Sequence, residues 1–305
     1  MKVLITDPIH EKGLKALKEK GFEVEYCPGI DKDALIKKVV DADILIVRSR
    51  TKVTKEVIDA AKKLKVIGRA GVGLDNIDVK YAQSKGIKVV NSAEAPSDSV
   101  AELTIGLMLS LLRRIPEADR SMKEGKWLKS ELMGRQLAGK TVGIIGLGRI
   151  GKKVALILKA MGADVIAYDL YPDKEFAHAH GIEFCEKLED LLKRADIITI
   201  HVPLTPETYH MIGEKEISMM KDGVYIVNTS RGAIIDTKAL TKALKEGKVA
   251  GAGLDVYEEE PPGDLEIIKF NNVVCTPHIG GSTIEAQEAI STILVDKIAK
   301  ALEEM

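Results

Sequence analysis

The chain has 305 residues, too many for one small domain and enough for two. Hydrophobic residues make up 45% of the chain and charged residues 30%, a balance typical of a globular protein with a sizeable core. The formal net charge is −1, so no overall positive field would attract nucleic acid or an anionic membrane. Any anionic ligand must therefore be bound by a local group of charges.

Cysteine usage and the apolar stretches indicate the compartment. The three cysteines, Cys27, Cys185 and Cys275, are far apart and form no CxxC pair, so we expect buried, reduced thiols. The first residues, MKVLITDP, are typical of a strand and a turn rather than of a signal peptide. The longest apolar stretch, Leu103–Leu112, is too short to cross a bilayer. These features predict a cytoplasmic protein with no membrane partner.

Short apolar runs alternate with amphipathic segments over the first third of the chain. Runs of four or five apolar residues between helices are typical of a parallel sheet covered on both faces. The strands expected here are Val3–Thr6, Glu23–Cys27, Ile44–Val47, Val66–Gly68 and Lys88–Asn91. The helices expected between them are Glu11–Lys20, Lys32–Val40, Lys55–Leu64 and Val79–Lys85.

The alternation stops near residue 98 and resumes near residue 141. From Asp98 to Arg114 the pattern predicts one helix, apolar around much of its circumference, which suggests burial between domains or subunits. Residues 115–138 show no strand pattern and contain the only tryptophan, so we interpret them as an arm that embraces a partner subunit. The later strands expected are Thr141–Ile145, Val165–Tyr168, Ile197–His201, Tyr225–Asn228, Gly251–Asp255 and Val273–Cys275, followed by a helix at Ile284–Glu304.

The strongest single motif is glycine-rich and lies between two expected strands. Residues 141–169, TVGIIGLGRIGKKVALILKAMGADVIAYD, contain Gly146, Gly148 and Gly151 in a GxGxxG pattern. The first glycine would permit the tight turn, the second would let a pyrophosphate approach the backbone, and the third would let helix and strand pack closely. The N-terminus of that helix offers free N–H groups to phosphates. GxGxxG alone is a weak signal, but here it lies between a strand and a helix.

An acidic residue, Asp169, ends the second strand, 18 residues after the last glycine. A carboxylate there can accept hydrogen bonds from both ribose hydroxyls and would repel a 2′-phosphate, so we expect NAD rather than NADP. The following residues, Leu170, Tyr171 and Pro172, offer no arginine for such a phosphate. NAD implies hydride transfer, for which the protein must supply substrate binding and a proton relay.

Three later strands each end in a polar segment. NTSRG places Arg231 after the first of these strands, and TPHIGG places His278 after the last. Between them, DVYEEEPP places Glu258, Glu259 and Glu260 after the strand that ends at Asp255. Because ligands bind at the carboxyl ends of strands in a doubly wound sheet, all should face the cofactor. Each could instead be a solvated loop residue, although together they suggest one site.

The chemistry of hydride transfer suggests a role for each residue type. Oxidation of a secondary alcohol releases a proton, and histidine is the suitable base near neutral pH. A neighbouring carboxylate would fix the tautomer of the imidazole and stabilise the imidazolium, while an arginine can hold an α-carboxylate through two parallel hydrogen bonds. Other histidines fit this role less well. His178 and His180 suggest an exposed helical face, His10 a turn, and His201 a packed position at the end of a strand.

Several motifs in order resemble the D-isomer-specific 2-hydroxyacid dehydrogenase family over nearly the whole chain. They are VRSRTKVT, GRAGVGLDNID, GLGRIG, NTSRG, DVYEEEPP and TPHIGGST. The resemblance implies that Arg231 holds the substrate carboxylate, that His278 is the acid/base, and that Glu260 pairs with His278. Motif and resemblance together imply cofactor contacts at Gly146, Gly148, Arg149, Ile150, Gly151, Asp169, Thr229, Ser230, Arg231, Asp255, His278, Gly280 and Gly281.

The resemblance also implies the fold: two doubly wound parallel-sheet domains of the α/β class. A Rossmann NAD-binding domain, residues 98–283, would be inserted into a flavodoxin-like substrate-binding domain, residues 1–97 and 284–305. Members of the family are usually homodimers built through the NAD-binding domain and its arm, here about residues 115–138.

The loops VRSRT and GRAG match the family's substrate loops, so Arg48, Ser49, Arg69 and Ala70 would contact the substrate with Arg231. A pair of arginines in otherwise neutral surroundings suits a phosphate. The expected reaction is oxidation of 3-phospho-D-glycerate to 3-phosphohydroxypyruvate with NAD, the first step of L-serine biosynthesis. The alternatives are a glyoxylate or hydroxypyruvate reductase, another D-2-hydroxyacid dehydrogenase or, in a different class, an NAD(H)-sensing corepressor that binds proteins.

Two departures from the family pattern carry expectations of their own. Val202 stands where members have a threonine or serine before the proline, so one hydrogen bond to the cofactor is expected to be absent. Many phosphoglycerate-oxidising members carry a C-terminal regulatory domain that binds serine. Because this chain ends at Met305, we expect no serine feedback through such a domain.

Overall fold

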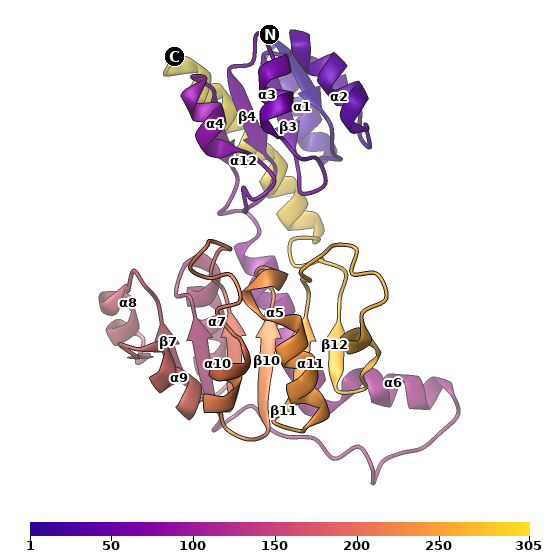
Figure 1. The fold of residues 1–305 in the computed structure, drawn as a ribbon, viewed down its shortest axis with the longest axis vertical. Helices are drawn as coiled ribbons and strands as arrows, with labels where there is room; N and C mark the ends of the chain where they lie inside the picture. The colour runs from indigo at the N-terminus through magenta and orange to yellow at the C-terminus, as the bar shows by residue number, and fades with distance from the viewer. The chain divides into compact units, whose positions relative to one another are not determined.

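A computed structural model describes residues 1–305, and the chain divides into two compact units (Figure 1). The first unit comprises Met1–Ser97 and Gly281–Met305, and the second comprises Asp98–Gly280. The second unit is therefore inserted into the first. It ends before the boundary expected at residue 283, so Gly281 belongs to the first unit.

The first unit contains a sheet of five parallel strands in the order β2-β1-β3-β4-β5. The strands are β1 Lys2–Ile5, β2 Glu23–Tyr26, β3 Ile44–Val47, β4 Val66–Arg69 and β5 Lys88–Asn91. This order is that of flavodoxin-like doubly wound folds, as expected. The run Ile44–Val47 is fully buried because helices cover both faces of the sheet.

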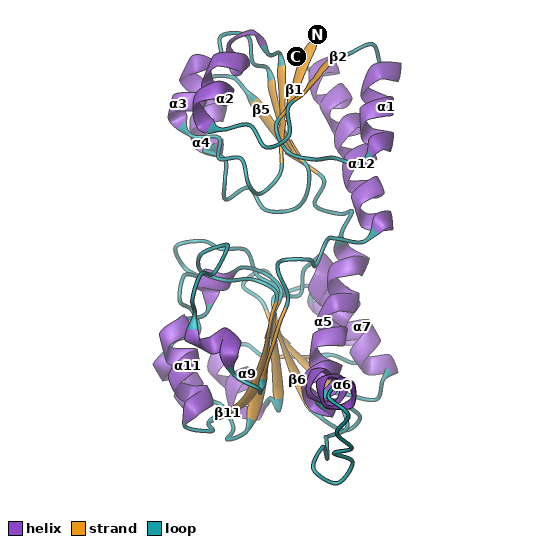
Figure 2. Cartoon of the chain, turned by 90° about the vertical axis from the view of Figure 1, so that its right-hand side faces the viewer, coloured by secondary structure: helices purple, strands orange, loops and turns teal.

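The helices of this unit are α1 Glu11–Glu19, α2 Lys32–Lys38, η1 Val39–Asp41, α3 Lys55–Ala60, α4 Val79–Ser84 and α12 Ile284–Glu303. Figure 2 shows α1 and α12 on one face of the sheet and α2, α3 and α4 on the other. The returning helix packs tightly, since a Cβ on Gly13 would lie 2.7 Å from Cβ of Ser291. The helix expected to reach Leu64 ends at Ala60, because Ala61 leaves the helical conformation with ψ at 88°.

The second unit contains seven parallel strands in the order β12-β11-β10-β9-β6-β7-β8. The strands are β6 Thr141–Ile145, β7 Asp164–Tyr168, β8 Glu183–Phe184, β9 Ile197–Ile200, β10 Val224–Asn228, β11 Val249–Leu254 and β12 Val273–Cys275. The strand order reverses between β6 and β9, which is the arrangement of a Rossmann fold. The sequence did not predict β8, since two residues are too few to show a periodicity.

The helices of this unit are α5 Ser97–Arg113, α6 Ile115–Lys123, α7 Arg149–Ala160, α8 Lys174–Ala179, α9 Leu188–Arg194, α10 Glu214–Met219, α11 Thr237–Lys245, η2 Gly232–Ile234 and η3 Glu266–Lys269. Helices α5 and α7 cover one face of the sheet, and α9 and α11 cover the other (Figure 2). The apolar residues of α5, including Met108 and Leu112, lie in the core beside Ile144 and Val227. These residues pack on the sheet of the helix's own unit, and burial of α5 between domains or subunits stays a prediction. None of the helices could cross a membrane, since none combines the length and the apolar character required.

The segment after α5 projects from the second unit (Figure 1). It consists of α6 and an irregular stretch up to β6, so the expected arm contains one helix and no strand. Four of its large apolar side chains are exposed: Ile115 by 49%, Met122 by 55%, Trp127 by 75% and Met133 by 84%. We call residues 115–138 the arm.

All three cysteines are free thiols. Cys185 is buried as expected, and burial raises its pKa. Cys27 and Cys275 are partly exposed, so the expectation of burial was wrong for these two. Both lie at strand ends, where the chain passes from the sheet into a loop.

Candidate active site

The glycine-rich turn joins β6 to α7. Gly146 has a φ of 97°, a left-handed value that favours glycine, and a Cβ on it would lie 2.8 Å from the carbonyl carbon of His201. A Cβ on Gly151 would lie 2.0 Å from the carbonyl oxygen of Gly146. A Cβ on Gly148, which caps α7, would have no neighbour within 4 Å. The open space at the helix N-terminus fits a pyrophosphate group.

The acid at the end of β7 folds back onto this turn. Oδ2 of Asp169 accepts a hydrogen bond of 2.7 Å from the backbone N–H of Leu147, and Oδ1 accepts one of 2.8 Å from that of Tyr171. The carboxylate is thereby fixed beside the glycine-rich turn, where an adenosine ribose would lie in a Rossmann fold. The next residues are open to solvent, with Leu170 exposed by 64% and Tyr171 by 90%.

The histidine at the end of β9 is suited to packing rather than proton transfer. Burial lowers the pKa of His201 to about 3, although part of the residue stays accessible. Its Nε2 lies 2.9 Å from Oγ1 of Thr199. His201 therefore stays neutral at physiological pH, which agrees with the packed position expected for it.

A buried asparagine shapes the turn that carries Arg231. Oδ1 of Asn228 accepts hydrogen bonds from the backbone N–H and the hydroxyl of Ser230, at 3.0 and 2.8 Å. Nδ2 of Asn228 donates to the carbonyl oxygen of Arg231 at 2.9 Å. The preceding Thr229 is 8% exposed, and its hydroxyl lies 2.9 Å from that of Thr104 on α5. Asn228 was not expected to shape the site, because only the structure shows that its amide bridges the turn.

Tyr257 links the segments that follow β10, β11 and β12. A Cβ on Gly232 would lie 1.9 Å from the carbonyl carbon of Tyr257, so the turn after β10 packs directly on the backbone of Tyr257. Its N–H donates to Oε1 of Glu260 at 3.2 Å, and its hydroxyl donates to the carbonyl oxygen of Thr276 at 3.0 Å. Sequence reasoning missed this link, since the motifs that contain these residues do not show that they contact one another.

Glu260 and His278 form a close pair. Nδ1 of His278 lies 2.7 Å from Oε2 of Glu260, and the two side chains are 36% and 37% exposed. Burial alone would raise the pKa of Glu260. The hydrogen bond and charge of His278, the N–H of Tyr257 and the charge of Arg231 outweigh it, so the pKa is lowered below 4.5. An ionised carboxylate can only accept hydrogen bonds, so Nδ1 carries the proton. Nε2 is left as the acceptor of the neutral imidazole.

A buried aspartate holds the turn that contains His278. His278 has a φ of 54°, a left-handed value that costs a residue other than glycine about 1–3 kcal/mol. Asp255 is 0% exposed, and its Oδ1 accepts hydrogen bonds from the hydroxyl of Thr276 and the N–H of Ile279, at 2.7 and 2.8 Å. Its Oδ2 accepts a third from the N–H of Gly280 at 2.8 Å. Three hydrogen bonds to one carboxylate therefore fix the backbone around the imidazole.

The structure separates the three consecutive glutamates by their contacts. Only Glu260 contacts His278, while Oε2 of Glu258 lies 3.1 Å from Nε2 of His210. Oε1 of Glu258 accepts from the N–H of Thr237 at 2.9 Å, so this residue joins loops of the second unit. Glu259 is exposed. The second His–Glu pair was not expected from the sequence.

The substrate loops expected in the first unit follow the adjacent strands β3 and β4. The N–H of Ala70 donates to the carbonyl oxygen of Val47 at 2.8 Å, which joins the two loops. The guanidinium of Arg69 lies over Gly71, where a Cβ would be 1.6 Å from Nη1. Ser49 is exposed, whereas Ala70 is 2% exposed and could meet a ligand only through its backbone.

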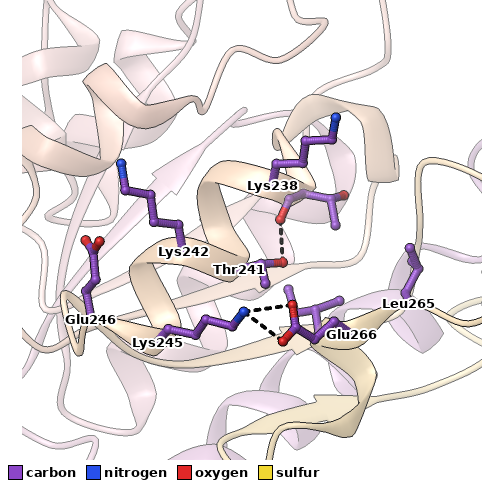
Figure 3. A pocket seen from close by; sticks show the side chains of 9 residues that line it. Lys238, Thr241, Lys242, Lys245, Glu246, Leu265 and Glu266 are labelled. Atoms are coloured by element: carbon purple, nitrogen blue, oxygen red, sulfur yellow. Dashed lines mark hydrogen bonds and ion pairs between the residues drawn. The ribbon is translucent and has the colours of Figure 1, made fainter.

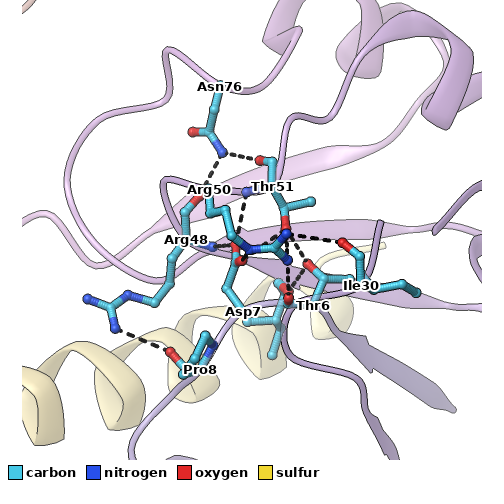
Figure 4. A network of polar contacts seen from close by, with 9 residues as sticks. Thr6, Asp7, Pro8, Ile30, Arg48, Arg50, Thr51 and Asn76 are labelled. Carbon is cyan, nitrogen blue, oxygen red and sulfur yellow. Dashed lines mark hydrogen bonds and ion pairs between the residues drawn. The ribbon is translucent and has the colours of Figure 1, made fainter. Parts of the chain in front are cut away.

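Arg48 and Arg50 lie in the same loop after β3 (Figure 4). Nη1 of Arg48 donates to the carbonyl oxygen of Pro8 at 3.3 Å. Burial lowers the pKa of Arg48, while the nearby charge of Asp7 acts in the opposite direction. An arginine remains cationic in either case at neutral pH, so this loop carries a fixed positive charge.

An open groove of about 470 Å³ lies between α11 and η3 of the second unit (Figure 3). Its walls include Lys238, Lys242 and Lys245, and Lys245 is paired with Glu266 at 2.7 Å. None of the expected site residues lines it. The lysines and glutamates of the groove lie at the surface, and nothing in their arrangement points to catalysis.

The parallel seven-stranded sheet, its order and the glycine-rich turn define a dinucleotide-binding α/β domain. Residues 105–280 match the family model described as "D-isomer specific 2-hydroxyacid dehydrogenase, NAD binding domain". The chain belongs to the D-isomer specific 2-hydroxyacid dehydrogenase family, and its cofactor is NAD.

Relatives with different activities match the chain over nearly all of its length. It is 54% identical to a D-3-phosphoglycerate dehydrogenase of Methanocaldococcus jannaschii, over 99% of this chain and 57% of that protein. It is 47% identical to a hydroxypyruvate reductase of Thermotoga maritima, over 99% of this chain and 98% of that protein. A D-lactate dehydrogenase of Aquifex aeolicus, complexed with NAD and lactic acid, is 35% identical, with a TM-score of 0.86 and coverage of 99% and 95%. The chain thus spans about half the length of the first of these relatives.

Proposed function

We propose that the chain transfers a hydride between a D-2-hydroxy acid and NAD, with His278 as the acid/base. The pair formed by His278 and Glu260, 2.7 Å apart, is the observation that carries this proposal. Its location at strand ends of an NAD-binding domain supports it, since this is where substrates meet the cofactor in doubly wound folds.

The steps follow from the residues. Bound NAD supplies the acceptor of the hydride that leaves the hydroxyl-bearing carbon. Arg231 would orient that carbon by holding the substrate carboxylate through paired hydrogen bonds. Nε2 of His278 would take the hydroxyl proton as the carbonyl forms, and ionised Glu260 would stabilise the resulting imidazolium. In the reverse direction the imidazolium would return the proton to the substrate oxygen.

Asp169 would select NAD by accepting hydrogen bonds from the ribose hydroxyls. We expect Asp169→Ala to raise the KM for NAD about tenfold or more, since a hydrogen bond to a charged group contributes about 1.5–3 kcal/mol. The preference for NAD over NADP should narrow, because the repulsion of a 2′-phosphate is lost as well. Kinetics with both cofactors test this, and an unchanged preference would contradict the ribose assignment.

We propose 3-phospho-D-glycerate as the substrate, which would place the reaction at the first step of L-serine biosynthesis. The similarity to a D-3-phosphoglycerate dehydrogenase supports this choice. Arg48, Ser49, Arg69 and Ala70 of the first unit are the proposed substrate contacts besides Arg231. The two arginines would suit the phosphate.

Hydroxypyruvate or glyoxylate reduction is the second candidate, because the chain matches a hydroxypyruvate reductase over 98% of that protein's length. Comparing kcat/KM for 3-phosphohydroxypyruvate, hydroxypyruvate and glyoxylate with NADH separates the two. We expect at least a tenfold advantage for the phosphorylated acid, most of it lost in Arg48→Ala. Equal values, with Arg48→Ala without effect, would favour the reductase. NADH binding without turnover of any oxo acid would favour an NAD(H)-sensing corepressor.

We also propose a homodimer assembled through the arm. Its exposed tryptophan and methionines support this, since large apolar side chains are otherwise mostly buried. Tryptophan and methionine are also among the residues enriched at protein interfaces.

A further inference from the structure

The loop after β3 contains two arginines with different surroundings (Figure 4). Each nitrogen of the Arg50 guanidinium donates at least one hydrogen bond. Nε donates to Oδ1 of Asp7 at 2.9 Å, and Nη1 donates to the carbonyl oxygen of Ile30 at 3.1 Å. Nη2 donates to the carbonyl oxygen of Thr6 at 2.8 Å and to the hydroxyl of Thr51 at 3.2 Å. Arg50 thus holds the loop, whereas the guanidinium of Arg48 makes a single long hydrogen bond, to Pro8.

Asp7, two residues after the end of β1, fixes the backbone of this loop. It is 1% exposed, and Oδ2 accepts hydrogen bonds from the N–H groups of Arg48 and Thr51 at 2.6 and 3.2 Å. Oδ1 accepts from the hydroxyl of Thr51 at 3.0 Å in addition to Arg50. Both oxygens are therefore saturated by the loop they support, and neither is available to a ligand.

Asn76 holds the same loop from the opposite side. Its Nδ2 donates to the carbonyl oxygens of Arg48 and Thr51, both at 2.6 Å. The backbone N–H and C=O of Arg48 are thus each tied to a different side chain. The Arg48 side chain can still rotate, but the two hydrogen bonds fix the position of its Cα.

We propose that Asp7 and Asn76 are positioning residues for substrate binding, which aim the guanidinium of Arg48 at the anionic group of the substrate. This rests on the proposed function, in which Arg48 contacts the substrate. Neither residue touches the substrate itself. Their effect is on the geometry of a charged anchor, and small displacements of such an anchor weaken orientation strongly.

The test measures KM for 3-phosphohydroxypyruvate, kcat, and the Kd of NADH by fluorescence, in the full chain. We expect Asp7→Asn and Asn76→Ala each to raise KM about tenfold, with kcat less affected and the Kd of NADH unchanged. NADH is proposed to bind to the second unit, so a general loss of fold would change both KM and the Kd of NADH. Asp59→Asn, which alters an exposed aspartate of the same unit paired with Tyr81 and Lys85, is the matched control and should change nothing.

Two further variants separate failure of this proposal from failure of the proposed function. Arg48→Ala should raise KM at least as much as Asp7→Asn, and Arg50→Met, which removes a partner of Asp7 in the same loop, should raise KM about as much as Asp7→Asn. If Arg48→Ala raises KM while Asp7→Asn and Asn76→Ala leave it unchanged, the positioning role is wrong and the substrate loop stands. If Arg48→Ala has no effect, both the loop assignment and the positioning role fall. A rise in KM for Arg50→Met together with an unchanged KM for Arg48→Ala would make Arg50 the substrate contact and overturn the proposal.

Discussion

At the scale of single residues, His278 shows what a sequence can and cannot reveal. Its place after a strand, between a proline and two glycines, made it a candidate base. The φ of 54° and the three hydrogen bonds that Asp255 accepts from its turn could not be predicted, because they depend on a contact between residues far apart in the chain. The same holds for Asn228 and Tyr257, whose supporting roles have no local signature.

Glu260 provides a prediction with a defined pH dependence. Because the pKa of Glu260 is lowered from its ordinary value, the carboxylate is ionised at neutral pH, and its pairing with His278 is lost only as acid protonates it. We expect Glu260→Gln to lower kcat about 100-fold in the neutral range. The difference in kcat between wild type and variant should shrink in acid, where the wild-type carboxylate takes up its proton.

Steady-state kinetics across pH provide the measurement, and Glu259→Gln is the control. Glu259 is an exposed neighbour, so its variant should behave as wild type at every pH. A loss of activity of similar size in both variants would assign the effect to the local negative charge rather than to the pair.

At the scale of elements, hydrophobic runs predicted most strands of both sheets to within a residue or two. Parallel strands that are buried on both faces consist of nearly continuous apolar residues, and such runs are visible in the sequence. Helix ends were less predictable. The segment expected as one helix from Lys32 to Val40 is divided into α2 and η1, and α3 ends early at Ala60. Helix propensity alone does not determine where these helices end, because the chain must leave the helix in time to enter the next strand.

Gly151 provides the prediction for an element. A methyl group there would lie 2.0 Å from the carbonyl oxygen of Gly146, so α7 must move away from β6. We expect Gly151→Ala to reduce the free energy of unfolding by about 1–3 kcal/mol and to weaken NADH binding. Thermal unfolding and NADH titration measure the two effects.

Gly106 on α5 is the matched control for this variant. A Cβ there would have no neighbour within 4 Å, so Gly106→Ala should raise the free energy of unfolding by about 0.5–1 kcal/mol and leave NADH binding unchanged. If Gly151→Ala bound NADH as well as Gly106→Ala does, close packing of α7 on the turn would not be needed for the cofactor site.

At the scale of the whole molecule, the family resemblance implied one domain inserted into another, and the chain divides into two units of which the second interrupts the first. The two sheets have the flavodoxin-like and Rossmann strand orders implied by the family resemblance. The sequence placed the second boundary slightly late, since Gly280 and Gly281 fall in one motif and yet belong to different units. No local pattern marks that division.

The proposed dimer gives the prediction at this scale. Trp127 and Met133 of the arm are exposed by 75% and 84%, so charges there should oppose burial in an interface. We expect Trp127→Asp with Met133→Asp to convert a dimer of the 33.2 kDa chain into a monomer. Light scattering after gel filtration measures this. Ile284→Asp, at an exposed apolar residue outside the arm, should leave the dimer intact, and a dimer that survives both arm charges would place the interface elsewhere.

Proton transfer by His278 is the central claim, and one comparison tests it most directly. Wild type and His278→Ala are assayed for NADH-dependent reduction of 3-phosphohydroxypyruvate and hydroxypyruvate, and NADH binding is titrated in the same samples. We expect kcat to fall by a factor of about 10²–10⁴, with NADH still bound. Turnover at the wild-type rate in His278→Ala would contradict the account, as would a parallel loss of NADH binding and fold.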